Sequence, residues 1–299
     1  MSNFILIILY IVIGYSIKNV SFTPANLANY LNKFVIYISL PAMILLQIPN
    51  LEFNASAYIP ISVAWMVMTF SAVLVYFTAK YFQFSKEITG SLMLVTVLTN
   101  SSFVGIPLIS AYFGATALPY IIVYDQLGTF LALATYGTIV AAYYSAKSEV
   151  NLKIITSKIL LFPPFLTLVI AMFLTDVKFI PFVDQVLHLA SETIVPFALI
   201  AVGLQMQFKL PKEELKPFVV SLSIKLIIAP LFAILICYIF SWEGLVAQVS
   251  IMEAGMAPMI TAAAMASFIG LAPRLSNAIV GYGILISFAT SFVLYQIII

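Results

Sequence analysis

Long apolar stretches, separated by short polar or charged connections, fill almost all of this 299-residue sequence. A membrane-spanning helix needs about 20 mainly apolar residues, within a range of about 17–25. Charged residues and Pro/Gly clusters delimit ten segments near this length, at residues 2–17, 27–48, 58–82, 88–113, 117–145, 157–174, 184–208, 217–240, 244–269 and 273–298. The pattern predicts an all-α integral membrane protein with ten transmembrane helices.

The first apolar segment, at residues 4–15, is also short enough to resemble the core of a signal peptide. It has no basic residue before it and no small-residue cleavage site after it. We therefore expect a retained helix that spans a bilayer only barely.

Basic residues give the predicted orientation. Alternating spans place Lys178 alone on one side of the membrane. The other side receives Lys18, Lys80, Lys86, Lys147, Lys153, Lys158, Lys209, Lys212, Lys216 and Arg274. Because cytoplasmic loops are enriched in Lys and Arg, both termini should lie outside the cytoplasm. We expect a multi-pass protein of the plasma membrane, which is the inner membrane in bacteria.

Composition narrows the function classes. Hydrophobic residues make up 63% of the chain and charged residues only 8%, against about 25% charged in a soluble domain. With a net charge of +2 and no basic tract, nucleic acid is not an expected partner. The single Cys237 and single His188 offer no disulfide framework, metal-ligand cluster or nucleophile–base set, so we expect no enzyme, metal or cofactor.

The basic loop at residues 146–158 divides the ten segments into five and five. Because five is odd, the halves would be inverted relative to one another, as in many carriers. We expect the first repeat over residues 1–148 and the second over 149–299. The fourth and ninth segments both begin at a glycine, Gly90 and Gly244, and both have Gly/Pro-interrupted centres. Such paired interruptions indicate a carrier's binding site, whereas a single membrane proline more often only kinks its helix.

The fourth segment contains the sequence TNSSFVGIPLISAYFG. Pro107 has no N–H and crowds the carbonyl four residues before it, and Gly105 lets the chain leave helical geometry at low cost. Asn100, Ser101 and Ser102 offer side-chain partners for the freed backbone groups. Because lipid cannot satisfy such groups, the break should face protein or a watery cavity.

The ninth segment, with EAGMAPMITAAAMASFIG, has a similar interruption at Gly255, Met256, Ala257 and Pro258. If the two breaks cross near the middle of the bilayer, each presents a half-helix N-terminus whose N–H groups attract anions. No arginine lies inside a predicted span, so backbone N–H groups and polar side chains would have to hold a carboxylate. We expect the substrate at this crossing.

Charged side chains inside a span are costly and usually mark an ion or substrate pathway. Glu253 precedes the ninth-segment break at a depth similar to Asn100 in the fourth, and Asp125 lies in the fifth segment. With Gln126 and Thr129 they form a predicted site for a coupling proton or cation, such as a sodium ion at Glu253 and Asn100. The alternative is a neutral, structural Glu253 bonded to the broken backbone.

The remaining ionisable groups within spans have simpler interpretations. Lys33 and Lys225 lie within a couple of turns of the cytoplasmic ends, so their ammonium groups should reach the interface. His188 lies near an outer end, and we expect it at the interface rather than in a proton relay. For Glu192 a structural hydrogen bond and a transport role are equally open.

At these residues the sequence resembles the auxin efflux carrier family, which includes plant PIN-type transporters and many bacterial permeases. The resemblance is strongest in NSSFVGIPLISAYFG, VPFALIAVGLQM and MAPMITAAAMASFIGLAPRLSNAIVGYGILIS, and the spacing of Asn100, Gly105, Ile106 and Pro107 is fairly specific. Length and span number fit over the whole chain. One departure concerns the ninth segment, where the family proline commonly follows Met256 directly; here Ala257 intervenes before Pro258.

The resemblance implies a fold like that of bile-acid sodium symporters. Helices 1, 2, 6 and 7 would form a scaffold, and helices 3–5 and 8–10 a moving transport unit in which helices 4 and 9 cross beside the substrate. It also implies a homodimer through the scaffold helices, and carboxylate substrates such as malate, malonate or indole-type acids.

The sequence thus predicts an elevator-type secondary transporter of small organic anions, coupled to sodium or protons or uncoupled. The alternative is a cation/proton antiporter of related architecture that uses Asp125 and Glu253. Such antiporters typically carry two adjacent acids on one helix, and this sequence has no such pair inside a span.

Overall fold

The structure is a computed structural model that describes residues 2–18, 20, 23–24, 26–50, 58–144, 161–174, 179–206 and 212–299. Within these ranges the regular secondary structure is helical, and β pairing is limited to one isolated bridge. The loop at residues 146–158, with the expected repeat boundary, lies outside the described residues, as do Lys178 and Lys209.

Six helices in the described chain are long and apolar enough to cross a membrane, so the protein is a multi-pass membrane protein. They are Leu27–Gln47, Tyr58–Tyr81, Ala115–Tyr144, Pro181–Gln205, Lys212–Ile239 and Pro273–Ile298. Shorter apolar helices lie at Ile5–Ile17, Ser101–Phe113 and Gly244–Ala254. The last two are short because the fourth and ninth predicted segments are each divided by a non-helical stretch. The ten-helix inverted repeat therefore stays a prediction.

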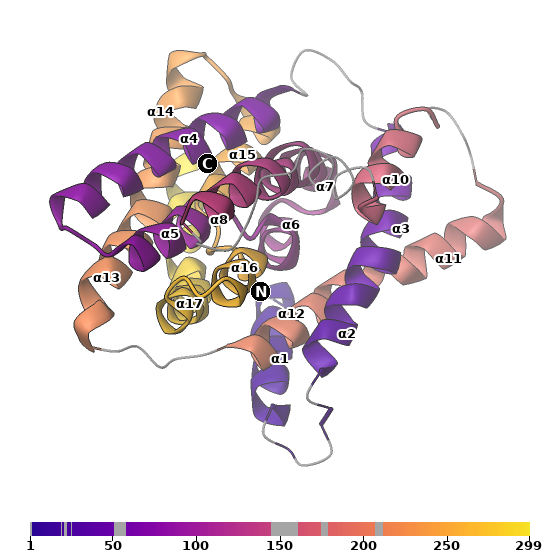
Figure 1. Cartoon of the computed structure of the whole chain (residues 1–299). Helices are drawn as coiled ribbons and strands as arrows, with labels where there is room; N and C mark the ends of the chain where they lie inside the picture. Colours follow the sequence, from indigo (N-terminus) through magenta and orange to yellow (C-terminus); the bar gives the residue numbers. More distant parts are fainter. Residues whose placement is uncertain are drawn as a thin grey trace.

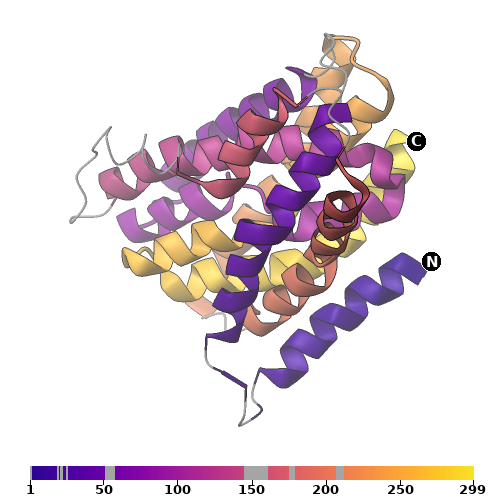
Figure 2. The same ribbon diagram turned by 90° about the vertical axis from the view of Figure 1, so that its right-hand side faces the viewer.

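The described helices form two groups, within which most of the packing occurs. The smaller helix group contains α1 (Ser2–Ile17), α2 (Leu27–Phe34), η1 (Val35–Ser39), α3 (Leu40–Gln47), η2 (Ile48–Asn50), α10 (Pro163–Ala171), α11 (Pro181–Glu192) and α12 (Ile194–Gln205). Figures 1 and 2 show α1 at the edge of the molecule, and α12 is its main partner.

The larger helix group holds the two interrupted segments. Its first part contains α4 (Tyr58–Tyr81), α5 (Lys86–Val95), η4 (Ser101–Gly105), α6 (Ile106–Phe113), η5 (Ala115–Ala117), α7 (Leu118–Val123), η6 (Tyr124–Phe130), η7 (Leu133–Gly137) and α8 (Thr138–Tyr144). Its second part contains η8 (Lys212–Glu214), α13 (Leu215–Ser223), η9 (Ile224–Ile228), α14 (Ala229–Ile239), α15 (Gly244–Ala254), α16 (Ile260–Phe268) and α17 (Pro273–Ile298). Its helices bury Val63, Leu92, Leu98, Ile109 and Met252 completely.

Prolines explain several irregular turns. Pro41, Pro107 and Pro230 each lie in the first turn of an α-helix that directly follows a π-helical turn, η1, η4 and η9 respectively. A proline cannot donate to the carbonyl four residues before it and crowds that group. A wider π turn changes the local hydrogen-bond register. The helices thereby continue past these prolines.

Two glycines let α1 and α12 approach closely. A Cβ added at Gly14 would collide with the carbonyl oxygen of Ile200, and one at Gly203 with that of Ile11. Small residues at such crossings bring helix backbones together in membranes.

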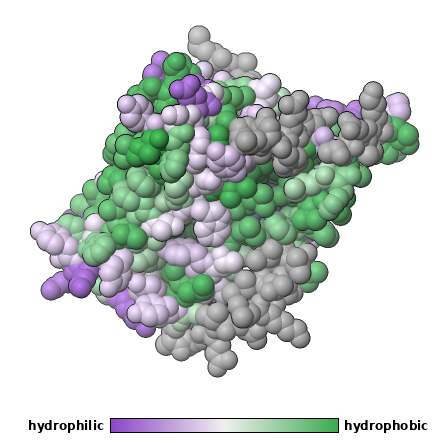
Figure 3. Space-filling view, turned by 90° about the horizontal axis from the view of Figure 1, so that it is seen from above, coloured by the Kyte–Doolittle hydropathy of each residue, from purple (hydrophilic) through white to green (hydrophobic). Residues whose placement is uncertain are grey.

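On the face shown in Figure 3, hydrophobic residues form most of the surface and strongly hydrophilic ones gather near its edges. This distribution suits a protein surrounded by lipid.

Candidate functional site

The two interrupted segments meet and pair through their backbones inside the larger helix group. Thr99 and Pro258 form an antiparallel bridge. The Asn100 N–H donates to the Ala257 carbonyl at 2.9 Å, and the Met259 N–H donates to the Leu98 carbonyl at 3.1 Å. Backbone groups at membrane depth must be satisfied within the protein, and each segment supplies partners for the other. We call residues 96–100 and 255–259 together the crossover.

The first break does not lie where the sequence pattern placed it. The α-helix α5 ends at Val95, and helical geometry resumes at Ser101. Gly105 and Pro107 lie beyond the break, in η4 and in the first turn of α6. The expectation that these two residues cause the interruption is therefore wrong, because the π turn of η4 accommodates the proline within a continuing helix.

The second break contains its own helix-breaking residues. Gly255, Met256, Ala257 and Pro258 all lie between the end of α15 and the start of α16. Met256 and Ala257 are fully buried. The Pro258 ring packs against α17, where a Cβ added at Gly283 would lie only 2.6 Å from the proline Cδ atom.

Asp125 is fully committed to hydrogen bonds within the larger helix group. Its Oδ1 atom accepts hydrogen bonds from the hydroxyls of Ser101 and Ser102, the latter at 2.6 Å, and its Oδ2 atom accepts one from Gln126 Nε2 at 2.6 Å. The side chain is 4% exposed. The carboxylate therefore fixes the start of η4 against η6.

Glu253 has the opposite environment. It is completely buried in the last turn of α15, and neither carboxylate oxygen has a hydrogen-bond partner among the described residues. The carboxylate packs against Gly105, where an added Cβ would lie 2.7 Å from Oε1 and 2.8 Å from Oε2. An unpartnered buried carboxylate is costly. The Glu253 carboxylate therefore calls for a proton or a nearby positive charge.

Lys225 is the site residue that the sequence pattern missed. The expectation that it reaches the membrane interface is wrong, because its side chain is 1% exposed and its Nζ atom donates to Thr99 Oγ1 at 2.5 Å. Its position in the middle of the apolar helix Lys212–Ile239, one turn before Pro230, was the available signal. Lys33 is exposed, as expected for a lysine that reaches the interface.

The remaining polar groups of the predicted coupling site are buried without forming one cluster. Asn100 Nδ2, Gln126 Oε1 and Thr129 Oγ1 have no hydrogen-bond partner in the described chain. The described contacts do not join Asn100 or Thr129 to either carboxylate through a hydrogen bond. His188 and Glu192 are exposed on α11, and His188 lies 3.6 Å from Asp184.

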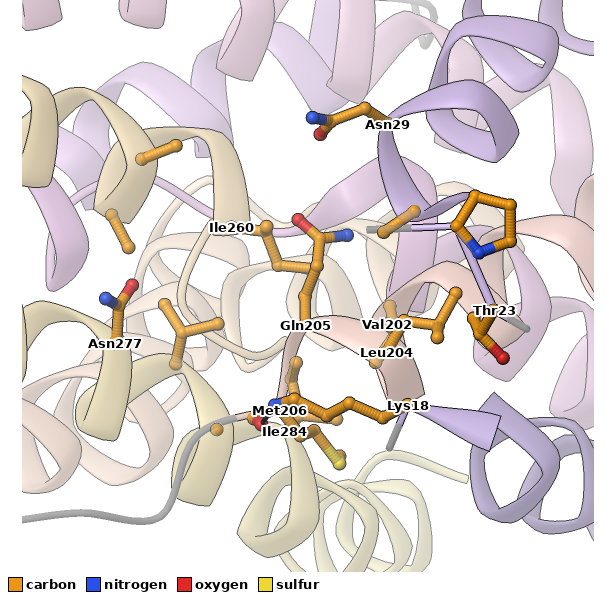
Figure 4. Close-up of a pocket in the computed structure, with 16 residues that line it drawn as sticks. Lys18, Thr23, Asn29, Val202, Leu204, Gln205, Met206, Ile260, Asn277 and Ile284 are labelled. Carbon is orange, nitrogen blue, oxygen red and sulfur yellow. Dashed lines mark hydrogen bonds between the residues drawn. The ribbon is translucent and has the colours of Figure 1, made fainter. Parts of the chain in front are cut away.

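A cavity of about 400 Å³ opens between the smaller and larger helix groups. It is lined by Lys18, Thr23, Pro24, Ala28, Asn29, Val202, Leu204, Gln205, Met206, Ile260, Ala263, Ala264, Asn277, Val280, Gly281 and Ile284. Figure 4 shows the amides of Asn29 and Gln205 reaching toward its middle, with Asn277 facing them from α17.

The charge of this cavity suits an anion. Lys18 is the charged residue among those that line it, and its Nζ atom donates to the Met206 carbonyl at 2.5 Å. Asn29, Gln205 and Asn277 add side-chain amide donors. The first turn of α16, which begins directly after the crossover, contributes Ile260 and Ala263. The cavity therefore adjoins the second break through the start of α16, but none of the crossover residues is among those that line it.

Comparisons with known proteins find a membrane transport family. A family model described as "Membrane transport protein" matches residues 1–295. An uncharacterized transporter of Methanothermobacter thermautotrophicus is 24% identical over 264 residues, which cover 87% of this chain and 85% of the relative. An uncharacterized transporter of Methanocaldococcus jannaschii is 27% identical over 265 residues, which cover 84% of this chain and 83% of the relative.

Proposed function

Because this chain belongs to the membrane transport protein family, that of the auxin efflux carriers, we propose that it is a secondary transporter of small organic anions. The observation that carries the proposal is the cavity between the two helix groups, which combines Lys18, three amide side chains and the start of α16. A helix N-terminus and N–H donors favour a carboxylate over a cation. The substrates are carboxylates such as dicarboxylates or auxin-like acids.

The mechanism we propose is elevator-type alternating access. The smaller helix group acts as the scaffold, and the larger one carries the crossover and moves. Two features support this division: packing occurs mainly within each group, and buried hydroxyl pairs join helices within the larger one, including Thr96 with Ser221 at 2.6 Å and Ser91 with Ser276 at 2.7 Å. The proposal includes two inverted five-helix repeats and a homodimer through the scaffold helices.

The orientation follows from the basic residues. The basic residues at helix ends include Lys18, directly after α1, and Lys80, Lys86, Lys212 and Arg274, in the terminal turns of their helices. With the cytoplasmic side assigned to them, both termini lie outside and the cavity beside Lys18 opens to the cytoplasm. The protein would reside in the plasma membrane, the inner membrane of a bacterium.

Glu253 is the candidate coupling group. Its unpartnered carboxylate lies beside Gly105 at the crossover, so binding of a proton or cation there would relieve the cost of a buried charge. The same observation supports the alternative of a cation/proton antiporter. Asp125 fits the antiporter less well, because three side chains already bond to its carboxylate.

Uptake by proteoliposomes tests the anion carrier directly. We expect uptake of at least one of labelled malate, malonate and indole-3-acetate, and a reduction of about tenfold or more in Asn277→Ala, which removes an amide from the cavity. Asn26→Ala is the matched control, because Asn26 is exposed and makes no side-chain cap bond. Inertness toward the whole acid panel together with cation-driven proton release would instead support the antiporter.

Coupling is tested by Glu253→Gln in the same vesicles. The amide keeps the shape of the side chain and removes its charge, so uptake should lose its dependence on an imposed gradient while the protein remains folded. Glu192→Gln, on the exposed face of α11, should leave the gradient dependence unchanged. If Glu253→Gln keeps the gradient dependence of the unaltered protein, Glu253 is not the coupling group.

A further inference from the structure

The crossover holds a cation of its own. Lys225 comes from η9, is 1% exposed, and reaches Thr99 in the first break with its Nζ atom. A buried lysine must be compensated by an opposite charge or by hydrogen bonds. The hydroxyl of Thr99 alone does not supply the negative charge that an ammonium group needs.

The charged groups packed around the crossover identify the compensating partner. They are Lys225 from η9, Glu253 from α15 and Asp125 from η6. Asp125 accepts hydrogen bonds from three side chains, whereas Glu253 accepts none in the described chain. Lys225 and Glu253 both lie at the crossover, because Lys225 bonds to Thr99 in the first break and Glu253 lies in the last turn of the helix that leads into the second, although the two form no ion pair within 4.0 Å. Glu253 is therefore the carboxylate that depends on the lysine.

We propose that Lys225 is the built-in counter-cation of the crossover. Its ammonium group compensates the negative charge of Glu253, a role that a bound sodium ion would otherwise have. A sodium ion beside Glu253 would be repelled by the lysine, because like charges in a poorly screened interior interact strongly. The protein should therefore need no sodium for stability or transport, and any ion bound at Glu253 is a proton. The link to transport rests on the proposed function, whereas the charge pairing does not.

Thermal unfolding of the purified full-length protein tests the pairing without a substrate. In sodium chloride and in choline chloride of equal ionic strength, the unaltered protein should melt at the same temperature within about 1 °C. Lys225→Met leaves Glu253 uncompensated, so its Tm should fall by about 5 °C or more in choline. Sodium should restore part of that loss. Lys33→Met, at an exposed lysine, is the matched control and should change neither value.

The double variant Lys225→Met/Glu253→Gln decides the result. It removes both charges, so it should recover most of the lost Tm and show no sodium dependence. If Lys225→Met does not fold, recovery of folded protein in the double variant supports the pairing equally. A sodium-stabilised unaltered protein, or a double variant no better than Lys225→Met, would overturn the proposal.

Uptake in sodium and choline media separates this inference from the proposed function. Equal rates in the two media are expected for any anion that is carried. If no anion is carried but the melting results hold, the anion-carrier function fails and the lysine–glutamate pairing stands.

Discussion

The two breaks of the crossover pair with one another, yet they are built differently. The second, at residues 255–259, carries Gly255 and Pro258 within it. The first, at residues 96–100, contains neither glycine nor proline. Its two threonine side chains instead bond to other helices: Thr96 to Ser221 on α13 and Thr99 to Lys225 on η9.

This difference shows two ways to hold an open backbone at membrane depth. The second break is favoured by its own residues, because glycine and an interior proline both weaken an α-helix. The first break requires neighbours, because Thr and Asn alone do not prevent a helix from continuing. Variants that act on one break at a time should therefore fail for different reasons.

The largest effect is expected from Gly283→Ala, which acts on the second break. The added Cβ would lie 2.6 Å from Cδ and 2.9 Å from Cγ of the rigid Pro258 ring. Overpacking of this kind costs about 1–3 kcal/mol. We expect the free energy of unfolding, measured in detergent, to fall by an amount in the upper part of that range. Gly137→Ala is the matched control, because a Cβ added there would lie 3.4 Å from its nearest neighbour, the Leu133 Cδ1 atom. Equal stabilities of the two variants would show that α17 does not confine the second break.

A smaller loss is expected from Ser221→Ala, which acts on the first break. It leaves the buried Thr96 hydroxyl without its 2.6 Å partner, at a cost of about 1–2 kcal/mol in unfolding free energy. Ser110→Ala removes a buried hydroxyl that has no partner in the described chain and should be nearly neutral. If both serine variants lose the same stability, the Thr96 bond does not support the break.

The smallest effect is expected from Pro107→Ala. Pro107 lies in the first turn of α6, where proline is well tolerated, so the break at residues 96–100 should persist and stability should change by less than about 1 kcal/mol. Pro258→Ala should cost more, because that ring fills the space beside Gly283. A transport defect as large in Pro107→Ala as in Pro258→Ala would show that Pro107 does contribute to the function of the crossover.

Part of the candidate site was predictable from sequence and part was not. The effect of Gly255 and Pro258 can be inferred from the local sequence, because glycine and proline each change the backbone conformations that are allowed at their own position. The same reasoning failed at Pro107, because a π turn absorbs a proline without ending the helix, and nothing in the local sequence distinguishes the two outcomes.

The sequence by itself determined that this chain lies in a membrane as apolar helices, because burial in lipid demands long apolar segments whatever their arrangement. It also located the second break. Only the tertiary structure decided the first break, the seating of Glu253 against Gly105 and the burial of Lys225 beside Thr99. These depend on contacts between residues more than 100 positions apart, and no local pattern specifies which distant helix will supply a hydroxyl or an ammonium group.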